Sequence, residues 1–331
     1  MMKKITLPFL VFVFTVFCIS CSSPEDDPED IPLLVDIATP TDDLILFSVN
    51  SSGRVFLMGD TTGFLNDLGQ IEKENSASIL QTQTMIGQDD TIYAIEYLYN
   101  PSPTNNLLVY EISTNTTQIV PLTLPTTITG NDVGIIALAL NGDTNLTAIV
   151  TENVLVTGAT KHLVNINLQD YTITELGITF TEDMITSMIH AGTNIYISTW
   201  NQGFLQADTA TNAVTKIPAI NGSRLAQINA TELGFMQTSN GFNSARPAII
   251  DVAVGNVTPN SQTESYGLIT IFGGTVYANQ QYLNLVATED LYFGVLKTDM
   301  TTGESTLTPI ITSNVDRNMV IVNTRPATNS N

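Results

Sequence analysis

The stretch Met184–Pro218 holds four short apolar runs separated by turn-forming residues, and it limits the fold more than any other part of the chain. The runs are Met184–Ile189, Asn194–Thr199, Gly203–Ala207 and Ala213–Ile217. Each has the length of a β-strand and is too short for a stable helix. The Gly, Asn and Asp residues between them favour tight turns. We therefore predict four antiparallel strands joined as a meander.

Similar turns recur about 40 to 55 residues apart, which is the spacing typical of the blades of a β-propeller. These turns are Asp60–Gly63, Ser113–Thr116, Gln169–Tyr171, Asp208–Asn212, Ala253–Asn256 and Asp299–Gly303. The sequence favours an all-β propeller of six four-stranded blades. Because Asp, Thr and Gly punctuate any all-β chain, five or seven blades, a multi-sheet sandwich and a β-solenoid stay open as alternatives.

The two ends of the predicted ring complement each other. The first unit begins at Leu44–Val49 and has three strands, while one surplus strand, Asn318–Val322, follows the last unit. Building one blade from both termini removes the open sheet edges, so we predict that the surplus strand completes the first blade. The units between are Ile79–Leu124, Val133–Phe180, Met184–Ile220, Leu225–Thr258 and Leu268–Ile311. We expect no helix.

The N-terminus reads as an export and anchoring signal. A basic start is followed by the apolar run Ile5–Ile19, which is too short to span a membrane and is typical of a signal peptide over residues 1–20. The run ends in Cys18-Ile19-Ser20-Cys21, which resembles the lipobox of bacterial lipoproteins, with Cys18 where Leu is usual. The resemblance implies a fatty acid such as palmitate on Cys21, which would hold the protein on the membrane.

Residues 21–40 are predicted to be a flexible tether, residues 41–325 the propeller and residues 326–331 a tail. The tether begins with five acids and no base between residues 22 and 30, a composition typical of solvated chain. This acidic stretch resembles the export tag of some Gram-negative lipoproteins. We therefore expect a lipid-anchored protein of the Gram-negative outer membrane, and the tag favours its exposure on the cell surface.

The charge of the chain limits its partners. It carries 32 acidic against 11 basic residues and a net charge of −21. Such a surface repels phosphate backbones and anionic headgroups, so we expect no nucleic-acid binding and membrane contact through the lipid alone. The remaining partner is expected to be a protein or a glycan.

Motifs for catalysis are missing from the sequence. The two histidines, His162 and His190, lie in different units and are predicted to be turn residues. The acid pairs Asp42-Asp43, Asp89-Asp90 and Glu182-Asp183 could bind calcium, but none has the spacing of a known calcium loop. No nucleophile elbow or nucleotide-binding motif occurs. We predict no metal site, no cofactor and no catalytic residue, and we favour a protein that is not an enzyme.

Over roughly residues 41–325 the chain resembles lipid-anchored propellers of the broad NHL, YVTN and TolB-like type. The resemblance implies a binding or scaffold module and carries over no catalytic residue. The alternative function is a carbohydrate-active or other hydrolase with its site in the propeller channel. Two or more carboxylates converging in that channel would favour the hydrolase.

Loop lengths predict which face of the ring binds. The connections between the first and second strands and between the third and fourth strands are tight, whereas those between the second and third strands vary and are often long. Meander geometry puts the latter on one rim. These connections are residues 100–106, 152–161, 200–203, 239–246 and 280–290. Function usually lies on such loops. Rare aromatic and basic residues there are the predicted ligand or partner contacts: Trp200, Tyr99, Tyr97, Tyr282, Arg246 and Lys161. Packing of the loops is the alternative role for them.

Overall fold

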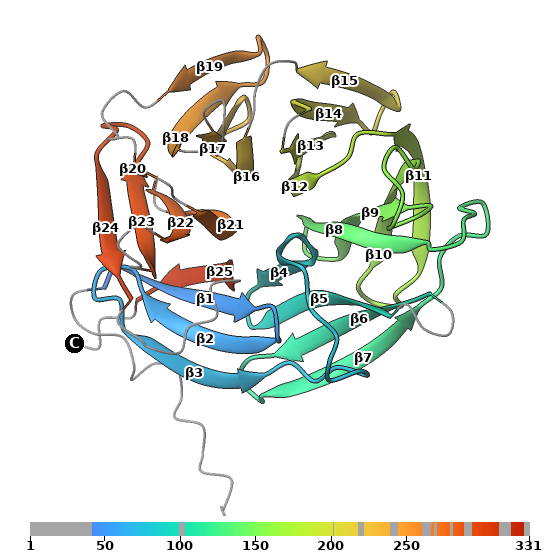
Figure 1. Cartoon of the computed structure of the whole chain (residues 1–331), viewed down its shortest axis with the longest axis horizontal. Coiled ribbons are helices and arrows are strands. Elements are labelled where there is room, and N and C mark those ends of the chain that lie inside the picture. The colour runs from blue at the N-terminus through green and yellow to red at the C-terminus, as the bar shows by residue number, and fades with distance from the viewer. Residues whose placement is uncertain are drawn as a thin grey trace, which may run out of the picture.

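The computed structural model shows a ring of six antiparallel sheets around a central axis (Figure 1). It describes residues 42–98, 103–200, 202–217, 222–238, 244–259, 266–267, 270–278, 281–287, 293–310 and 319–327. Each sheet has four strands, and one carries an additional short strand. The six-bladed β-propeller is thereby confirmed. The predicted signal peptide, Cys21 and the tether lie outside the described residues.

The blades follow one another in chain order, and in blades 2 to 6 the first strand lies next to the axis. Blade 1 contains β1 (Leu44–Asn50), β2 (Arg54–Gly59), β3 (Leu65–Gln70) and β25 (Met319–Pro326). Blade 2 contains β4 (Met85–Gln88), β5 (Thr91–Leu98), β6 (Thr104–Glu111) and β7 (Thr116–Leu122). Blade 3 contains β8 (Gly134–Asn141), β9 (Asn145–Thr151), β10 (Lys161–Asn167) and β11 (Ile173–Phe180).

The second half of the ring repeats this order. Blade 4 contains β12 (Ile185–Ala191), β13 (Asn194–Thr199), β14 (Phe204–Asp208) and β15 (Ala213–Ile217). Blade 5 contains β16 (Gly222–Gln227), β17 (Glu232–Thr238), β18 (Ser244–Asp251), β19 (Asn256–Pro259) and the short β20 (Tyr266–Gly267). Blade 6 contains β21 (Thr270–Ala278), β22 (Gln281–Ala287), β23 (Phe293–Asp299) and β24 (Ser305–Pro309).

The C-terminal strand closes the ring, as the sequence predicts. β25 pairs antiparallel with β1, with Asn50 opposite Met319 and Leu44 opposite Pro326. It occupies the axial position of blade 1 and contacts β4 on one side and β21 on the other (Figure 1). The first four side chains of β25 are buried. Blade 1 is therefore built from both ends of the chain.

The hydrophobic core lies between the blades. In β1 the side chains of Ile45, Phe47 and Val49 pack toward blade 2, and Leu44 and Leu46 pack toward blade 6. Successive side chains of a strand point to opposite faces of its sheet, so a strand that is apolar at every position serves two interfaces. Among the described residues, six apolar clusters each join two neighbouring blades. This arrangement explains why continuous apolar runs in this chain form strands.

The connections divide the ring into two rims. When the strands of each blade are counted outward from the axis, the connections between first and second strands and between third and fourth strands lie on one side, which we call the short-turn rim. Those between second and third strands and between blades lie on the other, which we call the long-loop rim. On the short-turn rim Asp208, Asp251 and Asp299 each accept a hydrogen bond from the backbone N–H two residues later, at 2.7 to 2.9 Å. This is the turn chemistry that the repeated Asp predicts.

The described chain begins and ends on the short-turn rim. Ala327 N–H donates to the backbone oxygen of Asp43 at 3.0 Å. Asp60, fully buried, accepts hydrogen bonds from the N–H groups of Asp43 and Leu44 at 3.0 and 3.1 Å. Lys297 of blade 6 donates to the same carboxylate at 2.7 Å. These bonds fasten the start of the ring to its last blade.

Helix is almost absent from the described residues, which hold one 3-10 turn, η2 (Thr82–Thr84), and no α-helix. η2 belongs to the connection between blades 1 and 2 and lies near the centre of the ring, where it contacts β8, β12 and β21 (Figure 1). Within this described part, no helix has the length and apolar character to cross a bilayer.

Candidate functional site: the long-loop rim of blades 2 to 4

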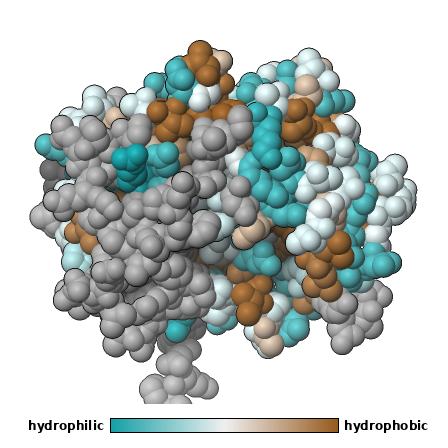
Figure 2. Space-filling view, turned by 45° about the horizontal axis from the view of Figure 1, so that its top comes forward, coloured by the Kyte–Doolittle hydropathy of each residue, from teal (hydrophilic) through white to brown (hydrophobic). Residues whose placement is uncertain are grey.

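Exposed aliphatic side chains gather on the long-loop rim. Five large apolar residues of the described chain are exposed, and four of them come from this rim of three neighbouring blades. The four are Ile79, Leu155, Val156 and Met184, with exposed fractions of 73%, 67%, 54% and 57%, and we call them the apolar crest. The fifth, Val254, lies on the short-turn rim. Figure 2 shows apolar residues reaching the surface in separate groups among hydrophilic ones.

Two adjoining hollows lie beside the apolar crest. The first has a volume of about 330 Å³ and is bordered by Ile79, Tyr97 and Leu155. The second has a volume of about 220 Å³ and extends along Val156 to Met184. Both are lined by Ile136, Val154 and Leu155, so they form one continuous depression. Exposed apolar surface around a depression marks an interaction site more often than isolated apolar residues do.

An ion pair holds the loops beneath the apolar crest. Lys161 Nζ lies 2.6 Å from Asp183 Oδ1, and the lysine side chain is almost fully buried. Asp183 also accepts a hydrogen bond from Gly158 N–H at 2.7 Å, and its own N–H donates to Gln202 Oε1 at 2.6 Å. Burial by itself raises the pKa of Asp183, but the bonds from Lys161 and Gly158 outweigh it and lower that pKa. Three loops are thereby joined at Asp183, two of them through its carboxylate and the third through its backbone N–H.

The backbone of Met184 is held in an unusual conformation. Its φ is 53°, a left-handed value that is uncommon for a residue with a side chain. The N–H of Trp200 donates to its carbonyl oxygen at 3.0 Å. Such conformations persist where surrounding structure enforces them, often at functional sites. Met184 therefore combines a strained backbone conformation with an exposed apolar side chain.

A buried glutamate shapes the loop that carries Ile79. Glu96 of β5 accepts hydrogen bonds from the N–H groups of Glu74 and Asn75 at 2.9 and 3.0 Å and from Ser78 Oγ at 2.6 Å. Asn106 Nδ2 donates to it at 3.3 Å. Ile79 follows directly in sequence, so this carboxylate fixes the blade-1 side of the apolar crest.

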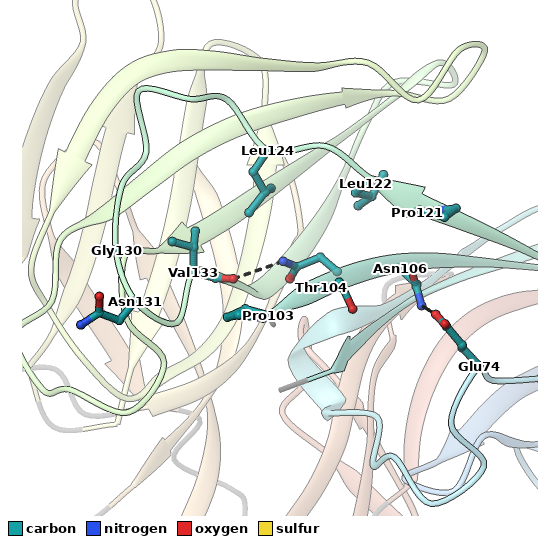
Figure 3. A pocket seen from close by; sticks show the side chains of 11 residues that line it. Glu74, Pro103, Thr104, Asn106, Pro121, Leu122, Leu124, Gly130, Asn131 and Val133 are labelled. Atoms are coloured by element: carbon teal, nitrogen blue, oxygen red, sulfur yellow. Dashed lines mark hydrogen bonds between the residues drawn. The ribbon is translucent and has the colours of Figure 1, made fainter. Parts of the chain in front are cut away.

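A larger and more polar pocket lies next to the first hollow, between blades 2 and 3 (Figure 3). Its volume is about 470 Å³, within the range of ligand pockets. Figure 3 shows Leu124 and Val133 on one side and Pro103 and Thr104 on the other. The Asn105 amide bridges the two blades, because it donates to Val133 O at 3.2 Å and accepts from Ile135 N–H at 2.8 Å.

The polar groups of this pocket are largely used within the protein. Besides Asn105, the Asn106 amide donates to Glu74 Oε2 at 2.7 Å and to Glu96 Oε2. No aromatic ring is among its described lining residues. A sugar usually needs free hydrogen-bonding groups and a ring for stacking, so this pocket offers little to a glycan.

The two histidines are strand residues, and their prediction as turn residues is wrong. His162 lies buried in β10, with Nδ1 2.9 Å from Glu175 Oε1 and Nε2 3.1 Å from Glu152 Oε1. The two carboxylates contact opposite ring nitrogens, so they do not converge on one point. His190 lies half-buried in β12, and burial lowers its pKa. Each histidine continues an apolar run, which the turn prediction overlooked.

The acid pairs singled out in the sequence are engaged within the protein. Asp42 accepts hydrogen bonds from the N–H groups of Thr61 and Thr62, and Asp90 accepts one from Ser113 N–H. Asp183 belongs to the ion pair with Lys161. Among the residues that the structure describes, no group of three acidic, His or Cys residues could hold a metal ion.

The predicted contact residues are only partly brought together. Tyr97 borders the first hollow, Lys161 borders the second, and Trp200 is partly exposed beside Met184. Arg246 lies on β18 of blade 5, away from the apolar crest. Tyr99, like Cys21, lies outside the described residues. The binding roles of these residues stay predictions.

The prediction that Tyr282 lies in a loop is wrong. The predicted connection 280–290 contains the strand β22, and Tyr282 lies at its second position with a fully buried side chain. Its hydroxyl donates to the backbone oxygen of Arg224 at 2.8 Å. Tyr282 is part of the apolar pattern of β22, and the loop prediction did not take that pattern into account.

The central channel contains a small cavity of about 100 Å³. Apolar residues of β4, β8, β12 and β25 line it together with Thr82, Gln83, Thr186, Ser187 and Arg224. No carboxylate occurs among these described lining residues. The arrangement therefore does not favour a hydrolase whose acid pair lies in the channel.

No protein-family model matches the sequence, and no curated protein matches it significantly. Similar solved structures are propeller proteins of low sequence identity. A puromycin hydrolase (S511A mutant with PGG) has a TM-score of 0.54 and 13% identity over 83% of this chain and 44% of that chain. TolB from Acinetobacter baumannii has a TM-score of 0.51 and 10% identity over 85% of this chain and 66% of that chain. A chain of a nidogen/laminin complex has a TM-score of 0.52 and 8% identity over 79% of this chain and 91% of that chain.

These similarities concern the fold alone. The chain spans less than half the length of the puromycin hydrolase. The likeness to TolB confirms the coarse TolB-like resemblance that the sequence indicates.

Proposed function

We propose that this protein is a cell-envelope lipoprotein whose propeller binds a protein partner through the apolar crest. The observation that carries the proposal is the gathering of Ile79, Leu155, Val156 and Met184 around one continuous depression. Burying these side chains against a partner contributes about 1.5–3 kcal/mol for each one that becomes fully buried. An apolar centre with a polar rim is typical of protein interfaces.

The chemistry of the rim favours a protein over a glycan. The apolar crest is aliphatic, and the polar pocket beside it has most of its amides committed to internal hydrogen bonds. The carboxylates of Asp132, Glu152 and Glu182 lie in the surrounding loops. We infer a partner segment with aliphatic side chains flanked by Lys or Arg, because complementary charge speeds association and selects partners. The similar fold of a chain from a nidogen/laminin complex agrees with a binding role.

The position of the termini fits a membrane anchor. Asp42 joins the ring on the short-turn rim, so a lipid on Cys21 would tether that side of the propeller. The apolar crest on the opposite rim would then face away from the membrane. On the outer leaflet of a Gram-negative cell, where we propose the protein lies, this rim would face the surroundings.

Site-directed photo-crosslinking in cells tests the proposal. A photoreactive amino acid at Leu155 or Met184 is expected to give a discrete protein adduct. The matched control is Val254, which has an exposed fraction of 64% on the opposite rim and should give none. Leu155→Asp should abolish the adduct formed from position 184 without lowering Tm, since the side chain is mostly exposed.

Equal adducts from positions 155 and 254, or no adduct from 155 and 184, would contradict the proposed protein-binding rim. Capture of a glycan by the wild type that persists in the Leu155→Asp variant would also contradict it. Radiolabelled palmitate tests the anchor separately, so the two parts of the proposal can fail independently.

A further inference from the structure

Arg224 is a cation enclosed in the channel, and no charged partner lies beside it among the residues that the structure describes. It lies on β16, next to the axis, and only 9% of the residue is exposed. No ion pair to it occurs in the described part of the chain. Nη1 donates to the backbone oxygen of Thr186 at a long 3.4 Å, and buried Nε has no hydrogen-bond partner there. A guanidinium has five N–H donors, and the described residues accept a hydrogen bond from only one of its nitrogens.

The backbone of Arg224 adopts a strained conformation that sets the direction of its side chain. Arg224 has a φ of 64°, in the left-handed region that residues with side chains seldom adopt. The register between β16 and β17 shifts between Ser223 and Ala226, so Arg224 sits in a β-bulge. Bulges re-aim side chains and recur next to functional sites. Tyr282 stabilises the bulge, because its hydroxyl donates to the carbonyl oxygen of Arg224.

The surroundings of the guanidinium suit a small anion. The cavity of about 100 Å³ beside it is lined by Thr82, Gln83, Thr186 and Ser187, with apolar groups completing the wall. A hydroxyl chain fixes this side of the channel: Thr186 Oγ1 and Ser187 Oγ each lie 2.7 Å from Ser198 Oγ, and Leu225 N–H donates to Ser187 Oγ. Gln83 Nε2 donates to Ile185 O at 3.2 Å and fastens η2 over the cavity.

We propose that the channel beside Arg224 is a binding site for a small carboxylate or oxyanion, held by two N–H groups of the guanidinium. The planar fork of arginine matches two oxygens of such an anion. Burial lowers the pKa of Arg224 to about 10, which leaves it positively charged at neutral pH. The cavity admits an anion of a few heavy atoms, such as acetate, formate or phosphate, and excludes a sugar acid.

The test compares the full-length wild type with Arg224→Met. Acetate at constant ionic strength, with gluconate as the bulky replacement anion, is expected to raise Tm of the wild type by several degrees. Arg224→Met should show no acetate-dependent rise, and its Tm in gluconate should equal or exceed that of the wild type, because the variant buries no unpaired charge. Calorimetric titration of the wild type should detect acetate, and phosphate in the same titration shows whether the site prefers carboxylate or oxyanion.

Three results would overturn the proposal. The first is an equal response to acetate in the wild type and in Arg224→Met. The second is the absence of heat and of any Tm shift with acetate, formate and phosphate in the wild type. The third is a large loss of Tm in Arg224→Met that Arg224→Lys restores without any response to acetate, which would reveal an internal partner for the cation. The outcome is independent of crosslinking at the apolar crest.

Discussion

Replacing Glu96 by Gln removes one charge from the centre of the loop that presents Ile79. In the wild type each carboxylate oxygen serves two donors: Oε1 accepts from Asn75 N–H and Ser78 Oγ, and Oε2 from Glu74 N–H and Asn106 Nδ2. Glutamine keeps one oxygen and puts an NH₂ group in place of the other. With the NH₂ group toward Asn75 and Ser78, the Ser78 hydroxyl can accept a hydrogen bond from it, but the Asn75 N–H loses its acceptor and faces another donor.

The magnitude follows from these contacts. Glu96 is fully buried, so water does not replace the lost bonds. The one buried donor left unsatisfied lowers the free energy of unfolding by about 1–3 kcal/mol. Because about 1 kcal/mol moves the Tm of a large domain by about 2–4 °C, we expect Tm to fall by about 2–12 °C at neutral pH.

Acid should reduce the difference between the two proteins. Burial by itself raises the pKa of Glu96, but the bonds from Ser78, Asn75, Glu74 and Asn106 outweigh it and lower that pKa below its ordinary value of 4.5. The unfolded chain titrates near the ordinary value. The stabilisation by the carboxylate is therefore complete above pH 4.5 and is lost as the pH falls through the lowered folded-state pKa.

Thermal unfolding followed by circular dichroism measures both effects. Glu111→Gln is the matched control, since Glu111 lies exposed at the other end of the same strand pair, opposite Thr91. Its Tm should stay within about 1 °C of the wild type, as expected for a surface position. The reasoning is refuted if Glu96→Gln melts like Glu111→Gln at neutral pH, or if its deficit grows below pH 4.5.

The other expectations concern the closure, the anchor and the ion pair. Deleting residues 318–331 removes the four buried side chains that begin β25, whose burial contributes about 6–12 kcal/mol to the stability of the fold. The deletion should therefore leave an aggregated protein. A Tm within about 2 °C of the parent would argue against closure. Cys21→Ser should abolish palmitate labelling and release the protein, whereas Cys18→Ser should retain both; labelling lost in Cys18→Ser alone would exclude the predicted acceptor. Lys161→Met should cost about 3 kcal/mol by leaving Asp183 unpaired, and the double variant with Asp183→Asn should recover part of that Tm loss; no recovery would count against the ion pair.

The blades were predictable because their signals are local. The runs Asn194–Thr199 and Ala213–Ile217 coincide with β13 and β15, and the turn between β14 and β15 uses the Asp208 side chain as the sequence indicates. Ring closure was also predictable, since a three-stranded first unit and a surplus last strand can each be recognised from alternation and turns. Both inferences need only the period of a strand and the rule that sheet edges are covered.

The apolar crest could not be predicted in the same way. Ile79, Leu155 and Met184 belong to three different connections. Each is an apolar residue, which looks in sequence like part of the core. Their meeting depends on the order of the blades in the ring and on which rim each connection occupies. Their exposure depends on Glu96 and on the Lys161–Asp183 ion pair, whose partners are distant in sequence.

Arg224 left a weaker signal that could have been used. Only the innermost strand of each blade borders the channel, and these strands are mostly apolar, so a cation there stands out. Arg325 on β25 is the other arginine among the described axial strands, but its guanidinium lies 4.7 Å from the ring centre of Phe47. That cation–π contact gives Arg325 a partner within the protein. Within the described chain, Arg224 has only a long bond to a neutral carbonyl, and its bulge holds it beside the cavity. Because strain and an unpaired buried charge both reduce stability, their combination at one residue favours a ligand-binding role over a packing role.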